Sequence, residues 1–244
     1  MTGILFLVVF LGLMIAFWSI RKDQSRRDLR EIPAFSRLKR AIALSVEAGK
    51  RLHISLGSRG LHDLRGAPAL VGLNLIQKIS RTVSVSDLPP IASSGDATLS
   101  ILSQDALHSG YREVNAESRF DPNSGQLTGL TPFSYAAGAL PLITDQPVSV
   151  TLLAGSYGSE ALLLTDAAER ADSLTFAGTE NINAQAVLYA SASESLIGEE
   201  LFAAGAYLQS SGMHVASLFA QDVFRWVVIV VLLVGIVLKF AGVL

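Results

Sequence analysis

The segment PVSVTLLAGSYGSE, residues 147–160, decides the fold of this chain. Its apolar, β-branched first part is typical of a strand that is buried on both faces. It then changes into glycine and serine, and an acidic residue opens a helical pattern. Four other passages repeat this change, at residues 53–60, 90–97, 174–181 and 195–200. The repeated order of buried strand, small-residue loop and helix predicts an α/β domain with parallel strands.

Six strand candidates alternate with helical patterns, which favours a Rossmann-like, doubly wound, mainly parallel sheet of about six strands. The strand candidates are residues 53–56, 91–93, 127–131, a strand that begins at 148, 174–177 and 195–197. The helical patterns cover residues 35–49, 69–85, 96–112, 159–171, 182–190 and 199–209, with another helix that starts at Pro132. That helix should end or kink near Ala139, because Pro141 has no backbone N–H. The order of the strands does not follow from these patterns.

Both ends of the chain are apolar. Residues 4–20 carry no charge, and residues 226–244 carry only Lys239. Each stretch approaches the roughly 20 residues that a membrane-spanning helix needs. The first predicts an uncleaved anchor more than a signal peptide, because no Lys or Arg precedes it and no small-residue cleavage site follows it. We therefore expect transmembrane helices at 1–20 and 213–244, a basic juxtamembrane linker at 21–34 and an α/β domain at 35–212.

Charge is segregated along the chain. Residues 21–40 hold eight Lys or Arg against three Asp or Glu, whereas residues 41–222 hold nine against eighteen. The positive-inside rule predicts a two-pass protein of the bacterial cytoplasmic membrane, with the α/β domain in the cytoplasm and both termini outside. An acidic domain repels phosphate backbones, so we expect no nucleic-acid partner. The expected partners are the lipid bilayer and either copies of the chain, through basic and acidic segments, or other membrane proteins.

Ligands of open α/β sheets bind beyond the carboxyl ends of the strands. The candidate ligand-binding residues lie in the predicted loops there: Ser58, Arg59, Ser94, Gly95, Asp96, Ser156, Tyr157, Thr179 and Glu180. Neither of the phosphate-binding patterns GxGxxG and GxxxxGK[ST] occurs. Acidic residues stand instead at the predicted helix starts, where they complement the helix dipole and repel phosphate: Asp96, Glu160, Glu180, Glu199 and Glu200. A ligand should be neutral or cationic, or an anion attracted by Arg59 and Arg65.

The sequence shows no catalytic constellation. It has no cysteine, which excludes disulfides and thiolate metal sites, and its four histidines lack metal-ligand spacing, so we expect no metal and no cofactor. Among the histidines, the pair His62 and Asp63 is the best catalytic candidate, because it could share a cleft with Ser94. Ser156 in AGSYG has only half of the GxSxG pattern of hydrolases.

Four strings carry a family resemblance: LHISLGSRGL, PPIASSGDATL, AGSYGSEALL and IGEELFAAGAYL. At these strings the chain resembles a family of bacterial membrane proteins that is catalogued as a domain of unknown function. The resemblance covers most of residues 53–208 and implies the architecture without any catalytic residue. We expect a membrane-tethered, non-catalytic α/β domain with a structural or assembly role, as a homo-oligomer or as a subunit of a larger membrane complex. The alternative is a small-molecule sensor or enzyme that uses the strand-end loops.

Overall fold

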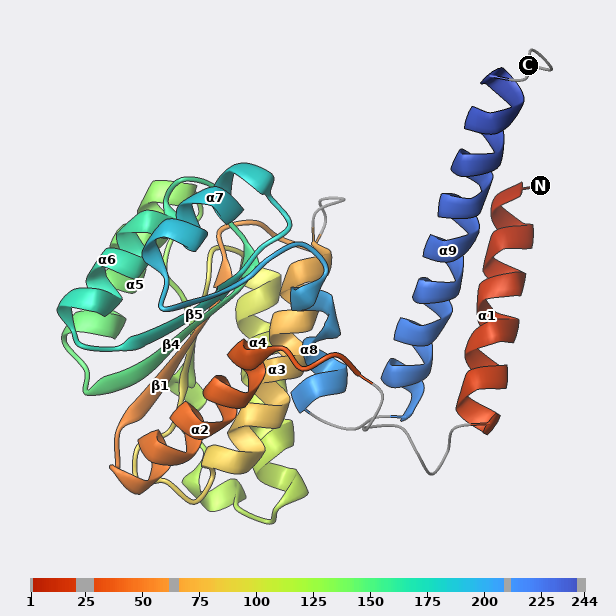
Figure 1. The fold of residues 1–244 in the computed structure, drawn as a ribbon. Coiled ribbons are helices and arrows are strands. Elements are labelled where there is room, and N and C mark those ends of the chain that lie inside the picture. The colour runs from red at the N-terminus through yellow and green to blue at the C-terminus, as the bar shows by residue number, and fades with distance from the viewer. Residues whose placement is uncertain (1, 21–28, 62–65, 209–211, 241–244) are drawn as a thin grey trace. The chain divides into compact units, whose positions relative to one another are not determined.

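The computed structural model describes residues 2–20, 29–61, 66–208 and 212–240 (Figure 1). The chain divides into two units, of which one comprises Met1–Glu31 with Gln209–Leu244 and the other Ile32–Leu208. The first unit contains helices α1 (Thr2–Ile20) and α9 (Gly212–Phe240). The second contains all the strands and the remaining described helices, and we call it the α/β unit.

The α/β unit is built on a six-stranded sheet in which all five strand pairings are parallel. Its strands are β1 (Arg51–Gly57), β2 (Ile91–Ser94), β3 (Gly125–Leu127), β4 (Val148–Ser156), β5 (Leu174–Gly178) and β6 (Glu194–Leu196). The strand order is β3-β2-β1-β4-β5-β6. The predicted α/β class with a parallel sheet of about six strands is therefore confirmed.

Helices cover both faces of this sheet (Figure 1). One face carries α2 (Pro33–Glu47), α3 (Ala67–Val83), α4 (Ala97–Glu113) and α8 (Glu200–Leu208), and the other carries α5 (Pro132–Thr144), α6 (Ala161–Arg170) and α7 (Ile182–Ser191). Strand β4 supplies both cores, because successive side chains of a strand point to opposite faces. Val150 and Leu152 belong to the core under α3, whereas Leu153 belongs to the core under α6. This burial on both faces explains why residues 148–154 are mainly apolar, with Ser149 and Thr151 as the exceptions.

The connections create one point at which the sheet changes direction. The helices α3 and α4 lead outward from β1 to β2 and β3, and α5 then returns the chain to β4, which pairs with β1 on the other side. From β4 the chain proceeds through α6 and α7 to β5 and β6. The loops that leave β1 and β4 therefore run to opposite faces, which makes their junction the topological switch point of the sheet.

Two local predictions are wrong. The third strand was expected at residues 127–131, but it spans Gly125–Leu127 and pairs Ala92 with Gly125. It is a three-residue edge strand whose position depends on β2 and not on its own pattern. Two short 3-10 helices, Glu117–Arg119 and Pro122–Ser124, precede it.

Helix α5 was expected to end or kink near Ala139, yet it continues through Pro141 to Thr144. Only one hydrogen bond is lost, and Ala137, whose carbonyl would have accepted it, lies on the exposed side of the helix. The next turn is intact, because the Asp145 N–H donates to the Pro141 carbonyl at 3.0 Å.

The first unit is an antiparallel pair of helices. The ring centroids of Phe6 and Phe224 are 4.7 Å apart, and those of Phe17 and Phe219 are 6.0 Å apart. Among the described residues, α9 is the one helix that is long and apolar enough to cross a membrane, and the apolar helical stretch Gly3–Ser19 is shorter. Most of the predicted basic linker, residues 21–28, lies outside the described residues.

Candidate functional site

The loops after β1, β2 and β4 pack directly on one another at the switch point. Gly57 has a φ of 88°, and a Cβ there would collide with the carbonyl oxygen of Ser156. The Ser58 N–H donates to that same oxygen at 3.2 Å, and the Gly95 N–H donates to the Gly57 carbonyl at 2.9 Å. A Cβ on Gly95 would lie 2.7 Å from the Ser58 Cα. These two glycines therefore permit close packing of backbone against backbone.

Glu160 is a carboxylate that the sequence pattern did not select as a site residue, and it fills this junction. Its side chain is buried, with 2% of the residue exposed, at the start of α6. One oxygen, Oε1, accepts hydrogen bonds from the Ser58 hydroxyl at 2.8 Å and from the Gly158 N–H at 2.9 Å. A buried carboxylate at a helix N-terminus occupies the position that suits the anion of a ligand in such folds.

A second carboxylate, Glu180, joins the ends of β4 and β5. The Ser156 hydroxyl donates to its Oε1 at 2.6 Å, and the Thr179 hydroxyl donates to its Oε2 at 3.2 Å. Thr179 also accepts from the Tyr157 N–H at 3.3 Å. Glu180 is half-buried, whereas Ser156 and Thr179 are buried, so solvent reaches this group only at Glu180.

The remaining predicted site residues lie around β2 and in the loop after β1. Asp96 caps α4 by accepting from the Leu99 N–H at 2.9 Å, which confirms its predicted capping role. Ser94 is buried and donates to the Asp96 carbonyl at 3.0 Å. Arg59 lies half-buried in the loop after β1. The cap of α7 is Asn181 and not Glu180, because the Asn181 side chain accepts from the Asn183 N–H at 3.1 Å.

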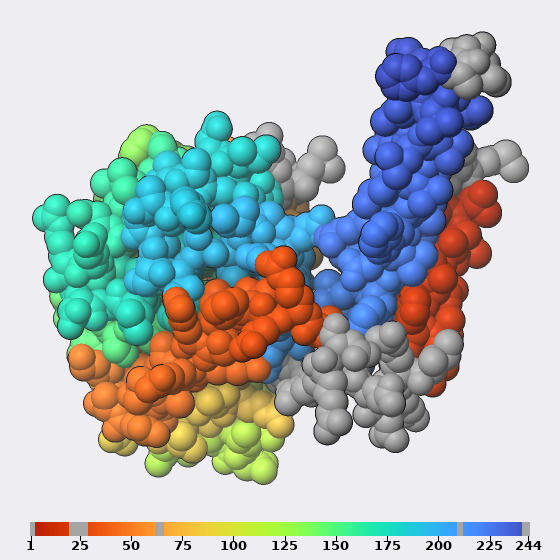
Figure 2. Space-filling model, viewed as in Figure 1, coloured from red at the N-terminus to blue at the C-terminus, as the bar shows by residue number. Residues whose placement is uncertain are grey.

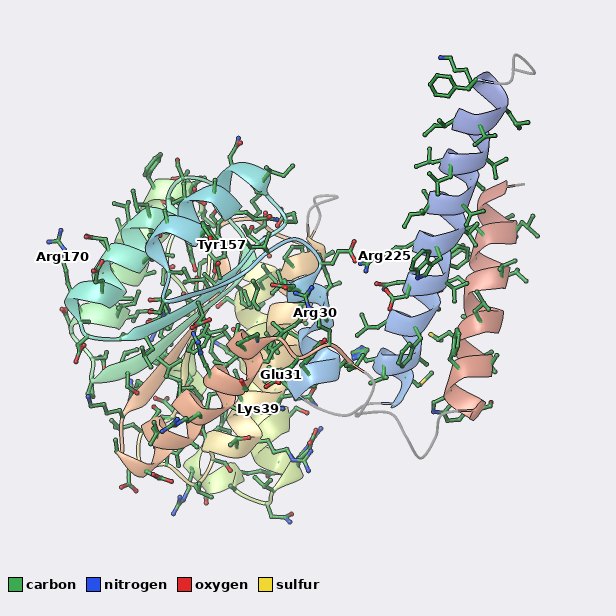
Figure 3. All side chains as sticks on the ribbon, in the orientation of Figure 1. Arg30, Glu31, Lys39, Tyr157, Arg170 and Arg225 are labelled. Atoms are coloured by element: carbon green, nitrogen blue, oxygen red, sulfur yellow. The ribbon has the colours of Figure 1, made fainter. Side chains whose placement is uncertain are left out.

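Tyr157 is a fully buried core residue, and Figure 3 labels it inside the α/β unit. Its hydroxyl donates to the Ser55 carbonyl at 2.7 Å and lies 2.6 Å from the Ser55 hydroxyl, which also bonds the hydroxyl of Tyr135. Tyr135 lies 3.2 Å from the Ser93 hydroxyl, and Ser93 lies 2.9 Å from His53 Nε2. These side chains form a continuous buried polar chain from His53 on β1 to Tyr157.

Burial controls the protonation of this polar chain. It raises the pKa values of Tyr135 and Tyr157 and lowers that of His53 to about 4. His53 Nδ1 has no hydrogen-bond partner among the described residues. The sequence signal for this chain was the pair of polar residues at alternate positions of β1, His53 and Ser55, inside an apolar strand. The pattern alone did not reveal that they meet two tyrosines.

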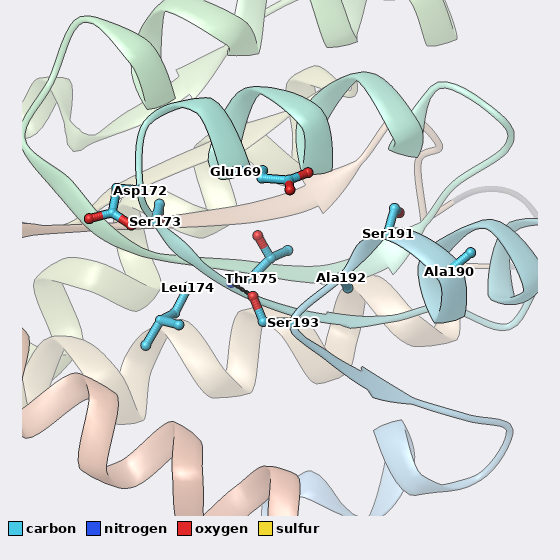
Figure 4. Close-up of a pocket in the computed structure, with 9 residues that line it drawn as sticks. All are labelled: Glu169, Asp172, Ser173, Leu174, Thr175, Ala190, Ser191, Ala192 and Ser193. Atoms are coloured by element: carbon cyan, nitrogen blue, oxygen red, sulfur yellow. Dashed lines mark hydrogen bonds between the residues drawn. The ribbon is translucent and has the colours of Figure 1, made fainter.

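A surface hollow of about 370 Å³ lies at the opposite, amino-terminal edge of the sheet (Figure 4). It is lined by Glu169, Asp172, Ser173, Leu174, Thr175, Ala190, Ser191, Ala192 and Ser193. Both of its carboxylates are exposed, and the Ser193 hydroxyl accepts from the Thr175 N–H at 3.1 Å. None of the predicted ligand-binding residues lines it.

Two further predictions concern catalysis and metals. His62, Asp63 and Arg65 lie outside the described residues. Within the described ranges, no group of three or more His, Cys, Asp or Glu side chains could hold a metal ion. The predicted ligand-binding residues around β4 lie together in space and are hydrogen-bonded to one another: Ser156 and Thr179 donate to Glu180, and the Tyr157 N–H donates to Thr179.

Comparison with known proteins gives one match. A family model described as a domain of unknown function (DUF6754) matches residues 1–244. No curated protein and no solved structure matches the chain. The family match confirms the resemblance to proteins of unknown function and extends it to the whole chain, whereas bacterial origin and membrane anchoring stay predictions.

Proposed function

We propose that this chain, which belongs to the DUF6754 family, is a membrane-tethered, non-catalytic α/β domain that acts as a structural or assembly component. It would work as a homo-oligomer or as a subunit of a larger membrane complex. The observation that carries the proposal is that the chain's own atoms fill the switch point. The loops pack closely on each other at Gly57 and Gly95, and the side chain of Glu160 is buried there. In a Rossmann-like sheet this space is the usual ligand site.

The energy of these contacts opposes ligand binding at the junction. A ligand that displaced Glu160 would break its hydrogen bonds with Ser58 and Gly158. Hydrogen bonds to a charged group contribute roughly 1.5–3 kcal/mol each, so the displacement costs about 3–6 kcal/mol. A cost of that size weakens binding by roughly 10²- to 10⁴-fold. An anionic cofactor would also meet the charge of Glu160 itself.

Tethering to a membrane is supported by the two apolar helices. Helix α9 has the length and composition of a membrane span, and its side chains from Trp226 to Val234 are exposed in the described structure. Leaving this surface in water is unfavourable, whereas hydrocarbon accepts it. With α1 as a second span and the basic residues from 21 to 30 on the inner side, the topology is two-pass with a cytoplasmic α/β unit.

The mass of the full chain in a mild detergent tests the proposal. An assembly component should elute as an oligomer, or together with other membrane proteins from its native membrane. A chain that is strictly monomeric in detergent, and that brings no partner from the membrane, would contradict the assembly role.

A sensor or enzyme role is the second candidate, and Glu180 is the observation that favours it. This half-buried carboxylate, which the buried hydroxyls of Ser156 and Thr179 hold in place, could bind a neutral polyol or a cation at the ends of β4 and β5. A thermal-shift screen with sugars, amino acids and nucleotides separates the two candidates. A ligand at 100 times its Kd adds about 2.7 kcal/mol of stability, which the assay detects, and no shift with any class would reject the second candidate.

A further inference from the structure

Exposed apolar side chains surround the edge of the sheet at which the strands end. Each helix from α3 to α8 follows a strand, so its amino end lies at this carboxyl edge. Each of these helices also exposes a large apolar side chain within its first five residues, with relative exposures between 43% and 80%. We call these six residues the apolar ring: Leu70, Ile101, Phe133, Leu162, Ile182 and Phe202.

The two edges of the α/β unit differ in character. The helix dipole favours acidic residues in a first turn, yet the first turns of α3 to α7 contain none. Apolar residues are exposed at the opposite, amino-terminal edge too, but they stand among charged ones, as Leu174 does near Asp172. The last turns of α3, α4 and α6 expose charged side chains there: Arg81, Arg112, Glu113, Glu169 and Arg170.

The ring occupies both layers of helices. Leu70, Ile101 and Phe202 belong to the layer of α3, α4 and α8, and the other three to the layer of α5, α6 and α7. In Figure 2 no other described element lies over the outer surface of α6 and α7, which is blue-green. Six strands are roughly 25 Å across, so a partner that contacts the whole ring must be broad and flat. A peptide or a single helix would contact one layer only.

The chain enters and leaves the α/β unit on the side of this edge. Helix α2 leads through the turn at Gly49 to the start of β1, so its amino end at Pro33 lies toward the carboxyl edge. The end of α8 lies beside it, because the ring centroids of Phe35 and Tyr207 are 4.9 Å apart. Both connections to the proposed membrane helices therefore start on this side of the unit.

Charge complementarity favours a phospholipid surface as the broad partner. Residues 21–30, which directly precede this entry point, hold five Lys or Arg against two Asp. Anionic headgroups attract Lys and Arg near the membrane surface. The edge itself carries Glu180, Glu199 and Glu200, which oppose such a surface, so the attraction comes from the basic segment and from the apolar ring. Large apolar side chains are favoured at the boundary between headgroups and acyl chains.

We propose that the apolar ring seats the carboxyl edge of the α/β unit in the headgroup layer of the membrane. The proposal rests on the membrane tethering proposed above and assigns the surface with which the unit contacts the bilayer. The edge at which ligands of such sheets usually bind would then face lipid, and the charged amino-terminal edge would stay in water.

Fluorescence quenching in lipid vesicles tests this contact. The chain has no cysteine, so one introduced cysteine carries one fluorescent label. Full-length Ile182→Cys and Ile101→Cys, one for each layer of helices, are labelled and reconstituted into vesicles of phosphatidylcholine and phosphatidylglycerol. Lipids with a nitroxide just below the headgroup should remove most of the fluorescence of both labels. The matched control is Val85→Cys at the opposite edge, which is about as exposed as Ile101 and should keep its fluorescence.

A second set of variants separates the apolar ring from the tether. Phe133→Ser with Leu162→Ser should restore fluorescence to the label at position 101, because the whole ring seats the edge. Unchanged quenching there would mean that the tether alone brings the edge to the lipid, and it would refute the role of the ring.

A label in α9 separates this inference from the proposed function. Without quenching of a label at Val230→Cys the chain is not inserted, and the tethering and the edge contact both fail. Quenching at 230 with none at 182 and 101 overturns the edge contact and leaves the tethering standing. Labels at 182 and 101 that are shielded from water but not quenched by lipid would mean that a protein covers the edge, which overturns the inference as well.

Discussion

Protonation of His53 should destabilise the α/β unit between neutral and mildly acidic pH. His53 is fully buried on β1, one ring nitrogen contacts Ser93, and Nδ1 has no partner among the described residues. The pKa of His53 falls from 6.5 to about 4 because burial penalises the charged ring. The unfolded chain therefore binds a proton at a higher pH than the folded chain. The contribution of His53 to stability is complete above pH 6.5 and is lost as the pH falls from 6.5 to about 4.

The size of this effect follows from the pKa difference. A difference of about 2.5 pKa units corresponds to about 3 kcal/mol of unfolding free energy at 1.36 kcal/mol per unit. Between about pH 7 and pH 5, the loss is about 2 kcal/mol, since titration is then still incomplete. The variant His53→Gln does not titrate there and should lack this part of the pH dependence. Carboxylates titrate equally in both chains, so their effect cancels in the difference.

Urea unfolding of the full chain in a non-ionic detergent provides the measurement. All five tyrosines lie between residues 32 and 208 and both tryptophans lie in α1 and α9, so the tyrosine signal reports the α/β unit. The wild type should lose about 2 kcal/mol more than His53→Gln between about pH 7 and pH 5. Equal losses in the two chains would refute the reasoning, because they would mean that His53 is solvated or charged in the folded state.

Three substitutions, two of them with a matched control, test the packing of the strand-end loops and the buried polar chain. Gly57→Ala should lower the unfolding free energy by about 2–4 kcal/mol, because its φ is strained for alanine and its Cβ would clash with Ser156. The control Gly49→Ala, with φ of 62° and open space around it, should lower the unfolding free energy by only about 1 kcal/mol. Glu160→Ala should cost about 2–5 kcal/mol, because two donors lose their acceptor, and added formate should restore part of the loss; no response to formate would argue against an anion site. Tyr157→Phe should lower the unfolding free energy by about 1–2 kcal/mol and the exposed Tyr189→Phe should leave it unchanged, so equal effects would contradict the buried polar chain.

Much of the fold could be predicted because buried parallel strands have a strong local pattern. The run at 148–154 is mainly apolar because both faces of β4 are covered, and that pattern can be seen in the sequence without knowing which strands lie beside it. The three-residue strand β3 has no such pattern, and its position depends on pairing with β2. The effect of Pro141 could not be predicted for the same reason. Whether α5 continues through a missing hydrogen bond depends on whether the carbonyl without a partner faces solvent, and the sequence does not show this.

The sequence predicted where the strand-end loops lie, but it did not predict how their residues are arranged against one another. Small residues at strand ends correctly indicated loops at one edge of a parallel sheet. Whether glycine there admits a ligand or another loop depends on what lies opposite, and Gly57 faces the Ser156 carbonyl. The bond from Ser58 to Glu160 joins residues 102 positions apart, so no local spacing could indicate it.

The amino-acid sequence by itself determined the α/β class, the two apolar ends and the acidic character of the domain, because these depend on composition and short-range periodicity. Only the tertiary structure decided the strand order, the closure of the switch point by Glu160, the buried polar chain from His53 to Tyr157 and the antiparallel pairing of α1 with α9. Each of these depends on contacts between distant segments, since hydrogen bonding and packing act through space and not along the chain.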